Sequence, residues 1–312
     1  MIDVSIIIVS FNTKKLLLAC LESIKRHTEG ISFEVVVIDN ASDDGSTKGL
    51  GKDVRVIANR KNLGFSRANN QGIKEAKGRY ILLLNSDTEF KENTLKKMVD
   101  WMDQHPKVGI STCTLLNPDG SIQATGGRFP DLLRMFLWAK FLDDLPGVAD
   151  LFGSYHPHTP NFFGKSDFYK REHRQDWVTG AFLLTRKEVL NKIGGLDEKF
   201  FMYVEEVDLC MRAKKDGWET WYIPATKVVH IGAASGKGEK VGFGDRQIGK
   251  EGGILGEFEG LKRFYKKHYP SWQYPILTLL LKTASVLRIV VFGILGGQKE
   301  ALRIYAKAFR TI

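Results

Sequence analysis

The stretch Arg79–Phe90, RYILLLNSDTEF, decides the fold, because within it an apolar run ends abruptly in polar residues. The run from Tyr80 to Leu84 is typical of a parallel strand that is covered on both faces. Ligands of open α/β sheets bind just beyond the carboxyl ends of such strands. Asn85-Ser86-Asp87 is therefore well placed to receive a metal-bound phosphate. The same residue types also suit a turn and the N-cap of the next helix, so the surrounding chain has to decide.

Strand and helix patterns alternate on both sides of this stretch. The β-branched and apolar runs predict strands at 4–10, 33–38, 54–58, 80–84 and 108–116. Helical spacing of apolar residues predicts helices at 13–27 and 91–104, and a further helix that follows the third strand and ends at about residue 76. Further along, residues 176–184 predict a loop followed by a strand, and two short closing strands are predicted at 218–223 and 227–231. This alternation indicates an α/β fold with a doubly wound, Rossmann-like sheet. Asp39 would stand at the carboxyl end of the second strand.

The sequence lacks both common glycine-rich phosphate loops. Ser10-Phe11-Asn12-Thr13 follows the first strand, where G-x-G-x-x-G would be expected, and no G-x-x-x-x-G-K-[ST] motif occurs. If phosphates bind at this edge, a metal must do what a glycine-rich loop does elsewhere. This absence raises the importance of Asp87.

Composition limits the class of protein and its partners. The 312 residues are 43% hydrophobic and 26% charged, enough for one large or two modest domains. The net charge of +10 suggests an acidic partner: a nucleic acid, a nucleotide diphosphate or an anionic membrane. We expect no nucleic-acid partner, because no motif for reading one is present. The three cysteines form no C-x-x-C pair, which favours a cytoplasmic protein, and the N-terminus is interpreted as a first strand and not as a signal peptide.

Residues 128–176 interrupt the alternation with an insertion rich in aromatic residues, basic residues and prolines. Such a segment fits a mobile lid, an acceptor-binding loop or a surface that touches lipid. An ordinary insertion that packs its aromatic side chains on the sheet is an equally weighted alternative.

An acidic cluster follows at Glu205, Glu206 and Asp208. If this segment is helical, Glu205 and Asp208 share one side and Glu206 lies about 100° round. The three carboxylates then cannot all face one atom, so one of them is the better base. The alternative is that acidic residues simply suit the first turn of a helix because of its dipole.

The end of the last strand carries a histidine, His230, which is either a structural residue or part of the site. Residues 232–253 are rich in glycine, lysine and serine and contain four basic residues: Lys237, Lys240, Arg246 and Lys250. We interpret them as a flexible basic loop near a diphosphate.

The most apolar part of the chain is 276–295. Its length permits a membrane span, but Lys282 and Arg288 near its middle would each cost about 2.5 to 3.5 kcal/mol on insertion scales. At 100° per residue, five basic residues fall within an arc of about 120°; these are Lys282, Arg288, Lys299, Arg303 and Lys307. We predict an amphipathic hairpin lying in the plane of an anionic membrane, which would place the protein peripherally on the inner face of the cell membrane. The alternative is a helix pair packed on the catalytic domain or in a homodimer interface.

Taken in order, the motifs resemble glycosyltransferase family 2, the inverting nucleotide-sugar enzymes of GT-A fold. The resemblance covers about residues 3–231 and rests on SIIIVSFN, VVVIDNASDDGS, NLGFSRANNQGI, LLLNSDT, WVTGAFLLTR, GGLDEKFFMYVEEVDLCMR and VVHIG. Within the family the set looks most like the rhamnosyltransferase branch that builds bacterial cell-wall and surface polysaccharides. It implies a GT-A domain at 1–231 and a separate segment at 232–312 that holds the basic loop and the C-terminal helices.

The resemblance also implies roles for individual residues. Asp39 would hydrogen-bond the pyrimidine base, and the remaining nucleotide pocket would be lined by Ser10, Asn12, Asn40, Asn62, Gly64, Asn69, Asn85 and Ser86. Asp87 would bind the Mg²⁺ or Mn²⁺ that bridges the phosphates, and His230 would add a ligand or contact the phosphates. The family often has D-x-D where this chain has Asn85-Ser86-Asp87, so Asn85 would contribute less than an aspartate. Trp177, Gly180 and Ala181 are the candidates for the donor-sugar pocket.

In the family the base lies in an E-D pair before a further aspartate, and here the pair is Glu205-Glu206, followed by Asp208. We predict Glu206 as the base and Asp208 as the reserve. The implied reaction moves a sugar, best guess rhamnose from dTDP-rhamnose, to a lipid-linked or growing cell-surface glycan. The alternatives are a hexosyl or N-acetylhexosaminyl transferase that uses a UDP-sugar, and a nucleotide-sugar-binding scaffold that is catalytically silent.

Overall fold

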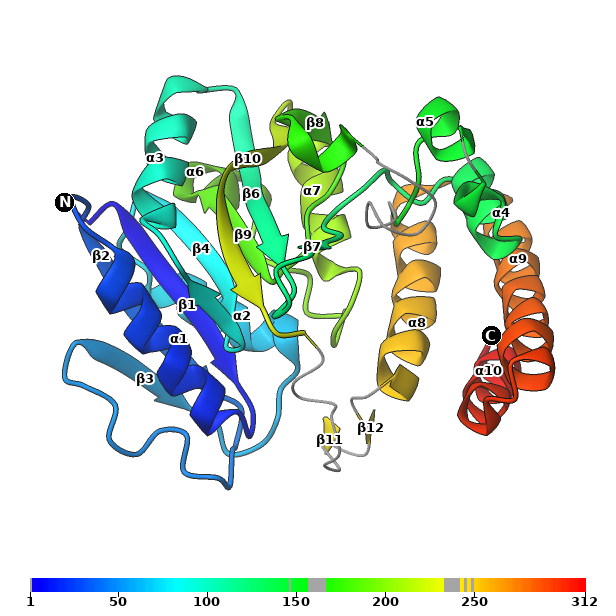
Figure 1. The fold of residues 1–312 in the computed structure, drawn as a ribbon, viewed down its shortest axis with the longest axis horizontal. Coiled ribbons are helices and arrows are strands. Elements are labelled where there is room, and N and C mark those ends of the chain that lie inside the picture. The colour runs from blue at the N-terminus through cyan, green and yellow to red at the C-terminus, as the bar shows by residue number, and fades with distance from the viewer. Residues whose placement is uncertain (1, 146, 157–166, 233–241, 244–245, 248–249) are drawn as a thin grey trace.

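The computed structural model describes residues 2–145, 147–156, 167–232, 242–243, 246–247 and 250–312 (Figure 1). A mixed ten-stranded sheet forms its centre, in the order β3-β2-β1-β4-β9-β6-β10-β5, with β7 on β6 and β8 on β10. Its strands are β1 (Val4–Ser10), β2 (Phe33–Asp39), β3 (Val54–Ala58), β4 (Tyr80–Asn85), β5 (Thr88–Phe90), β6 (Val108–Leu116), β7 (Ile122–Gln123), β8 (His173–Gln175), β9 (Phe182–Arg186) and β10 (Glu219–His230). A small hairpin, β11 (Gly242–Phe243) and β12 (Arg246–Gln247), stands apart from it.

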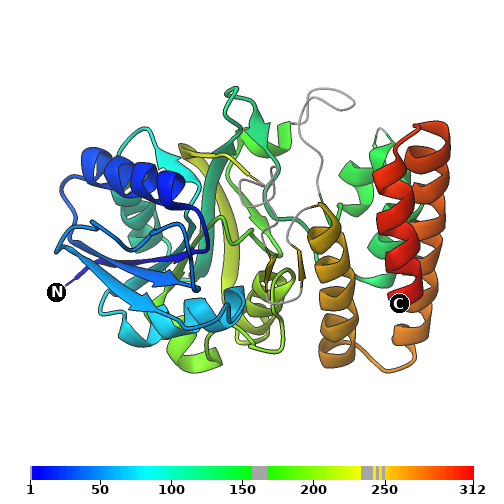
Figure 2. The ribbon, with the colours of Figure 1, turned by 90° about the horizontal axis from the view of Figure 1, so that it is seen from below.

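Helices cover both faces of the sheet and form a bundle at one end (Figure 2). They are α1 (Lys14–His27), α2 (Phe65–Glu75), α3 (Thr94–Gln104), α4 (Leu132–Ala139), α5 (Val148–Phe152), α6 (Lys187–Ile193), α7 (Glu205–Lys215), α8 (Lys250–His268), α9 (Gln273–Arg288) and α10 (Lys299–Thr311). A π-helical turn, Ile289–Leu295, extends α9, and short 3-10 turns lie at Leu142–Asp144 and Asp167–Lys170. The helix α10 follows a break in the chain at Gly297, which has a φ of 65°.

The central strands are buried on both faces, as their apolar runs predicted. In β1, Val4, Ile6 and Ile8 pack with α1 and α3, and Ile7 packs on the opposite side with α2 and α7. This alternation with a period of two is the direct result of the strand pleat. The second cluster continues without a break into Phe258, Leu261 and Phe264 of α8 and then into α9 and α10. The division of the chain at residue 231 stays a prediction.

Two local differences from the sequence expectations bring His230 to β4. The predicted strands at 218–223 and 227–231 form one strand, β10, with a register shift between Ile223 and Lys227, where Pro224 cannot donate a ladder hydrogen bond. Thr88–Phe90, for which no strand was predicted, forms the three-residue strand β5, which pairs antiparallel with β10 and sets Thr88 opposite His230. A strand this short depends on a partner far away in the sequence, so its own residues do not predict it.

The predicted membrane-facing basic arc is wrong for Arg288. This side chain is 6% exposed, and its guanidinium lies 4.2 Å from the Trp138 ring centre and 4.5 Å from that of Phe141. It also lies 3.2 Å from the carbonyl oxygen of Trp138, to which it donates a hydrogen bond. Arg303 and Lys307 of the same arc pair with Glu251 of α8 at 2.8 and 2.7 Å. Part of the arc therefore faces protein, because α4 and α8 supply partners that periodicity alone cannot reveal.

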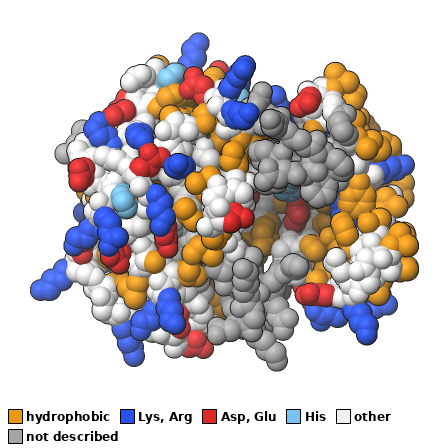
Figure 3. Space-filling view, viewed as in Figure 1, with side chains coloured by type: hydrophobic (Ala, Val, Ile, Leu, Met, Phe, Trp, Pro, Cys, Tyr) orange, Lys and Arg blue, Asp and Glu red, His pale blue; other side chains and the backbone are white. Residues whose placement is uncertain are grey.

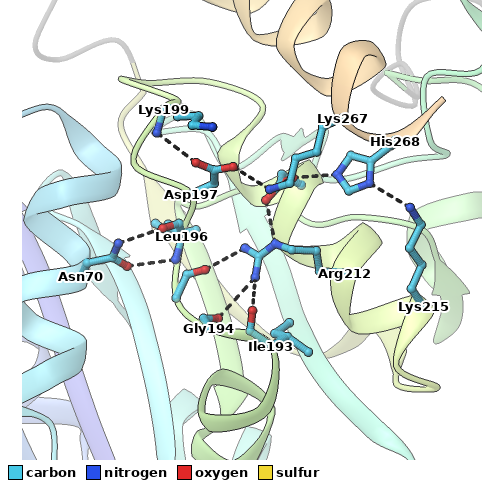
Figure 4. Close-up of polar contacts among 12 residues, drawn as sticks. Asn70, Ile193, Gly194, Leu196, Asp197, Lys199, Arg212, Lys215, Lys267 and His268 are labelled. Atoms are coloured by element: carbon cyan, nitrogen blue, oxygen red, sulfur yellow. Dashed lines mark hydrogen bonds and ion pairs between the residues drawn. The ribbon is translucent and has the colours of Figure 1, made fainter. Parts of the chain in front are cut away.

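A buried carboxylate, Asp208 of α7, joins the sheet domain to α8. Figure 4 shows its partners Arg212, Lys267 and His268. Its two oxygens accept from Arg212 Nε at 2.8 Å, His268 Nε2 at 2.7 Å and Lys267 Nζ at 2.8 Å. Lys215 Nζ lies 3.0 Å from the other ring nitrogen of His268, so that nitrogen accepts and Nε2 carries the proton given to Asp208. Burial alone would raise the pKa of Asp208, but His268, Arg212 and Lys267 lower it to about 2.

We predict that Asp208→Asn destabilises the protein by about 3–5 kcal/mol, because it removes one partner of a buried, hydrogen-bonded charge cluster. Urea unfolding followed by circular dichroism measures this. The difference in free energy of unfolding between the wild type and the variant should be fully present above about pH 4, where the carboxyl is ionised even in the unfolded chain. It should disappear as the pH falls toward 2, where Asp208 becomes protonated in the folded protein. Asp100→Asn is the matched control, because Asp100 pairs with Lys96 on an exposed helix face and should change stability by less than about 1 kcal/mol. Equal effects of the two substitutions would contradict the prediction.

Candidate functional site

The carboxyl ends of β1, β2 and β4 meet at one edge of the sheet. The parallel register sets Ser10 opposite Asp39 and Val9 opposite Asn85, so the polar residues that follow these strands come together. Behind this edge runs a chain of buried hydroxyls: Thr13 Oγ1 lies 3.0 Å from Ser10 Oγ and 2.9 Å from Ser86 Oγ. Thr13 was not among the predicted site residues. Through these two hydrogen bonds Thr13 holds the loop after β1 against the turn Asn85-Ser86-Asp87.

Asp39 has one carboxylate oxygen available for a ligand. Its Oδ2 accepts from the backbone N–H of Ser42 at 3.2 Å, and its Oδ1 is buried with no partner in the described part of the chain. Asn12, at a φ of 54°, accepts from the backbone N–H of Asp43 at 2.9 Å and so ties the first loop to the second. Asparagine tolerates this left-handed conformation better than most residues. A buried acceptor without a partner is costly unless a bound donor satisfies it.

The asparagines predicted for the nucleotide pocket mostly hold the loop at 59–65 in place. Asn40 Nδ2 donates to the carbonyl oxygen of Gly64 at 3.3 Å, and Asn69 Nδ2 donates to that of Phe65 at 2.9 Å. Asn62 Oδ1 accepts from the N–H of Gly64 at 2.9 Å, while its Nδ2 is buried with no partner among the described residues. Direct contacts of these side chains with a nucleotide stay predictions.

The loop at 59–65 also contacts the loop that precedes α7. The backbone N–H of Phe65 donates to the carbonyl oxygen of Phe201 at 2.7 Å. Gly64, at a φ of 83°, allows this approach, because a Cβ there would lie 2.7 Å from the same oxygen. This contact brings the loop that carries the asparagines beside the loop that leads to Glu205 and Glu206.

Asp87 and His230 face each other across the β5–β10 pairing. His230 Nε2 lies 3.3 Å from Asp87 Oδ1 and 3.2 Å from Asn85 Nδ2. His230 Nδ1 lies 2.6 Å from Gln123 Oε1, and the Gln123 amide is itself held by Asn117 at 3.0 Å. Because a carbonyl oxygen can only accept, Nδ1 carries the proton and the Nε2 lone pair points toward Asp87 and Asn85.

This pair fits a divalent cation. A carboxylate oxygen and an imidazole nitrogen face the same point, and the orienting bond from Gln123 is of the kind that usually fixes a metal-binding histidine. Within the described ranges no group of three or more His, Cys, Asp or Glu side chains is placed to hold a metal ion. Further ligands would therefore have to come from another group, as Mg²⁺ commonly takes them from substrate phosphates.

Two residues before the acidic cluster adopt the left-handed conformation: Tyr203 has a φ of 72° and Val204 a φ of 70°. For a β-branched residue such as Val204 this is strained, and such strain persists only where packing enforces it. Glycines of α8 provide that packing, because a Cβ at Gly256 would lie 2.8 Å from the Tyr203 ring and one at Gly260 2.7 Å from Val204. The strain turns the chain sharply into the first turn of α7.

Glu205 and Glu206 begin α7, each with one buried carboxylate oxygen that has no partner in the described part of the chain. Burial raises the pKa of Glu206 to about 7. Burial and the adjacent Glu206 raise the pKa of Glu205 well above its ordinary value. Glu206 is the more exposed of the two, so it is the one that can meet a substrate near neutral pH.

A partly exposed pair beside Glu206, His156 and Glu257, was not predicted from the sequence. His156 Nε2 lies 2.6 Å from Glu257 Oε1. Burial alone would lower the pKa of His156, but the Glu257 carboxylate raises it, and the charge of His156 in turn lowers the pKa of Glu206. His156 comes from the aromatic insertion and Glu257 from α8, so no local pattern connects them.

The remaining predicted residues lie as follows. Trp177 is buried, donates through Nε1 to the carbonyl oxygen of Arg128 at 3.1 Å and lies 5.5 Å from the His156 ring. Ala181 accepts from the backbone N–H of Asn85 at 3.1 Å, and Gly180 packs against Phe65. Their contact with a donor sugar stays a prediction.

The role of Asp208 as a reserve base also stays a prediction, and its three ion-pair partners do not favour it. Most of the predicted basic loop at 232–253 lies outside the described residues.

Comparison with known proteins agrees with this arrangement. The family model "Glycosyl transferase family 2" matches residues 5–208. The chain is 27% identical over 217 residues to the Mycobacterium tuberculosis N-acetylglucosaminyl-diphospho-decaprenol L-rhamnosyltransferase, which covers 64% of this chain and 67% of that protein. It is 25% identical over 174 residues to the Escherichia coli rhamnosyltransferase WbbL, which covers 54% of this chain and 60% of that protein.

Two solved structures share the fold. The mannosyltransferase PcManGT of Pyrobaculum calidifontis, in complex with GDP-Man and Mn²⁺, superposes with a TM-score of 0.56 at 17% identity, over 97% of this chain and 78% of that one. TarS 1-349 of S. aureus superposes with a TM-score of 0.51 at 14% identity, over 99% and 90%. The mixed sheet is thus of the GT-A type predicted from the sequence, and the chain belongs to glycosyl transferase family 2, with rhamnosyltransferases among its relatives, and is a glycosyltransferase.

Proposed function

We propose that this enzyme is a metal-dependent inverting transferase that moves rhamnose from dTDP-rhamnose to a lipid-linked or growing cell-surface glycan. The observation that carries the proposal is Glu206, a half-buried carboxyl at the start of α7 with a pKa of about 7. The same chain sets Asp87 opposite His230 at the carboxyl edge of the sheet. The rhamnosyl donor is favoured by the names of the M. tuberculosis and E. coli relatives. A lipid-linked acceptor is favoured by the diphospho-decaprenol in the first of those names.

The residues divide the reaction between them. Glu206 in its ionised form takes the proton from an acceptor hydroxyl as that oxygen attacks the anomeric carbon from the face opposite the nucleotide. A single displacement of this kind inverts the configuration. Asp87 and His230 would hold a divalent cation, which when bound supplies positive charge to the leaving diphosphate. Asp39 would accept a hydrogen bond from the base through its free Oδ1.

We also propose that the enzyme sits on the inner face of the cell membrane through an apolar face and not through the basic arc. The segment Gln273–Leu295 is long and apolar enough to cross a membrane by length and composition alone. Leu279, Ile294 and Leu295 are exposed by 65%, 63% and 78%. The exposed large hydrophobic residues of α4 and α5 are Leu133, Phe136, Leu151 and Phe152. Figure 3 shows hydrophobic side chains gathered on the end of the molecule that the helical bundle forms.

Lipid is the favoured occupant of this face because lysines flank it. Lys140 Nζ lies 4.6 Å from the ring centre of Phe136, and Lys282 Nζ lies 5.3 Å from that of Phe309, which is also exposed. Lysines beside exposed aromatic rings suit the boundary between acyl chains and anionic head groups.

For the base, we predict that Glu206→Gln lowers kcat by about 10²- to 10⁴-fold and leaves donor binding unchanged, because only proton removal is lost. In the wild type, kcat/KM should fall as the pH drops below about 7, where Glu206 becomes protonated. Release of nucleotide diphosphate measures the rate, and calorimetry measures donor binding. Glu188→Gln on the exposed face of α6 is the control and should change neither.

A second variant tests the origin of that pKa. His156→Gln removes the positive charge that lowers the pKa of Glu206, so the acidic limb of the pH profile should move to higher pH. An unmoved limb would contradict the assignment of Glu206. Normal donor binding with no turnover in the wild type would instead favour the silent scaffold, and turnover only with UDP-sugars would favour a hexosyl or N-acetylhexosaminyl transferase.

For the metal, we predict that chelation with EDTA abolishes turnover and that Asp87→Asn cannot be rescued by added Mn²⁺. Gln123→Leu should weaken the apparent affinity for Mn²⁺ about 10- to 100-fold, because Gln123 only orients His230. High Mn²⁺ should therefore restore the turnover of this variant. Calorimetry of dTDP with and without Mn²⁺ gives a readout independent of activity. Gln104→Leu, at the exposed end of α3, is the control. If dTDP binds equally with and without Mn²⁺, metal bridging is excluded.

For the membrane, we predict that the Leu279→Glu, Ile294→Glu double variant no longer floats with phosphatidylglycerol vesicles that carry the wild type. Leu18→Glu, on the exposed side of α1, is the matched control and should still float. Point substitutions are used because removal of α9 would also remove the buried Leu277 and Leu281. If the double variant floats as the wild type does, the apolar face does not bind the membrane. If the wild type sediments as a dimer and the double variant as a monomer, the face belongs to a homodimer interface.

A further inference from the structure

A cleft of about 1110 Å³ opens between residues 199–203, α8 and α10, on the side of loop 199–203 that faces the helical bundle. Its wall toward the catalytic site is apolar and includes Phe201 and Tyr203. Among its described lining residues six are cationic: Lys199, Lys262, Arg263, Lys266, Arg303 and Lys307. Only two, Glu251 and Glu259, are carboxylates, which leaves a surplus of positive charge.

The ion pairs inside the cleft do not use all of these cations. Glu251 holds both Arg303 and Lys307, and Glu259 lies 2.7 Å from Arg263. Lys199, Lys262 and Lys266 pair with no side-chain carboxylate within the part of the chain that the structure describes. Lys266 Nζ lies over the Tyr274 ring at 4.5 Å, and Lys262 Nζ donates at 3.2 Å to the carbonyl oxygen of Thr311. Three ammonium groups in one cleft are an arrangement that an anion stabilises.

The apolar wall connects the cleft to the catalytic residues. Tyr203 lines the cleft and stands two residues before Glu205, in the strained turn that begins α7. Phe201 lines the cleft and accepts from the N–H of Phe65 on the nucleotide side. A ligand bound in the cleft therefore shares a wall with the site in which Glu206 acts.

We propose that this cleft binds the diphosphate of a lipid-linked acceptor, with Lys199, Lys262 and Lys266 on the phosphate oxygens and the apolar wall along the first lipid carbons. The inference rests on the proposed function, because it names the place where the acceptor of that reaction is held. The volume exceeds what a single phosphate needs and suits an amphiphile. The combination of an apolar wall and lysines that pair with no side-chain carboxylate in the described part of the chain favours a lipid diphosphate over a neutral glycan.

The binding experiment uses farnesyl diphosphate as the probe, with dTDP and Mn²⁺ present at saturation to fill the nucleotide side. Calorimetry should show binding to the wild type and a loss of about 10- to 100-fold for Lys262→Gln, Lys266→Gln, because two charge-assisted contacts to phosphate are removed. Farnesol should not bind, and inorganic diphosphate should bind more weakly than farnesyl diphosphate. Lys25→Gln, Lys52→Gln removes two exposed lysines at the far edge of the sheet and should bind the probe as the wild type does.

The kinetic experiment separates this inference from the proposed function. With a lipid-linked acceptor, the Lys262→Gln, Lys266→Gln variant should raise KM for the acceptor about tenfold or more and leave KM for the donor and the acceptor-free hydrolysis of the donor unchanged. Wild-type turnover with an unchanged acceptor KM in the variant would overturn the cleft and leave the function standing. No nucleotide release by the wild type from any donor would overturn the function itself.

A last arm identifies the source of the anionic group. If phosphatidylglycerol vesicles displace farnesyl diphosphate from the wild type as effectively as the lipid-linked acceptor does, the cleft takes any anionic lipid head group and the assignment to the acceptor is wrong. If displacement requires the diphosphate, the assignment holds.

Discussion

The buried carboxylate of Asp208 is the interaction on which the arrangement of the site depends. It sits on α7, and two of its three partners, Lys267 and His268, end α8. A buried charge is tolerated only when it is fully paired, so α8 cannot leave α7 without exposing an uncompensated cluster. Because α8 is fixed at this point, its other faces are fixed as well.

Three of those faces contribute to function in different ways. The glycine face, with Gly256 and Gly260, allows the strained turn at Tyr203 and Val204 to approach closely. The face with Glu257 meets His156 from the aromatic insertion and so adjusts the pKa of the nearby Glu206. The remaining face lines the cationic cleft. One helix outside the sheet thus shapes the turn before the proposed base, its electrostatic setting and the proposed acceptor cleft.

Local patterns were sufficient to predict the sheet and the polar edge. The apolar runs at β1, β3 and β6 gave their bounds without error, and the register of β1 with β2 and β4 brought Ser10, Asp39 and Asn85 together as expected. Period-two burial and strand-end polarity are local properties, so one sequence contains them. Helical geometry likewise predicted that Glu205 and Glu206 differ in their surroundings, and Glu206 is the more exposed of the two.

What the sequence could not predict depends on partners far away in the chain. Arg288 looked like a lipid-facing cation because its partners, Trp138 and Phe141, come from an insertion without periodicity. Gln123 carries no motif, yet it sets the tautomer of a histidine more than a hundred residues later. Because part of the basic arc faces protein, the physical argument for membrane attachment also changes. If α9 contacts lipid through its apolar side, the bundle that carries it also carries the cationic cleft. A lipid-linked acceptor could then reach the cleft from the bilayer without leaving it, and its sugar would extend past Tyr203 toward Glu206.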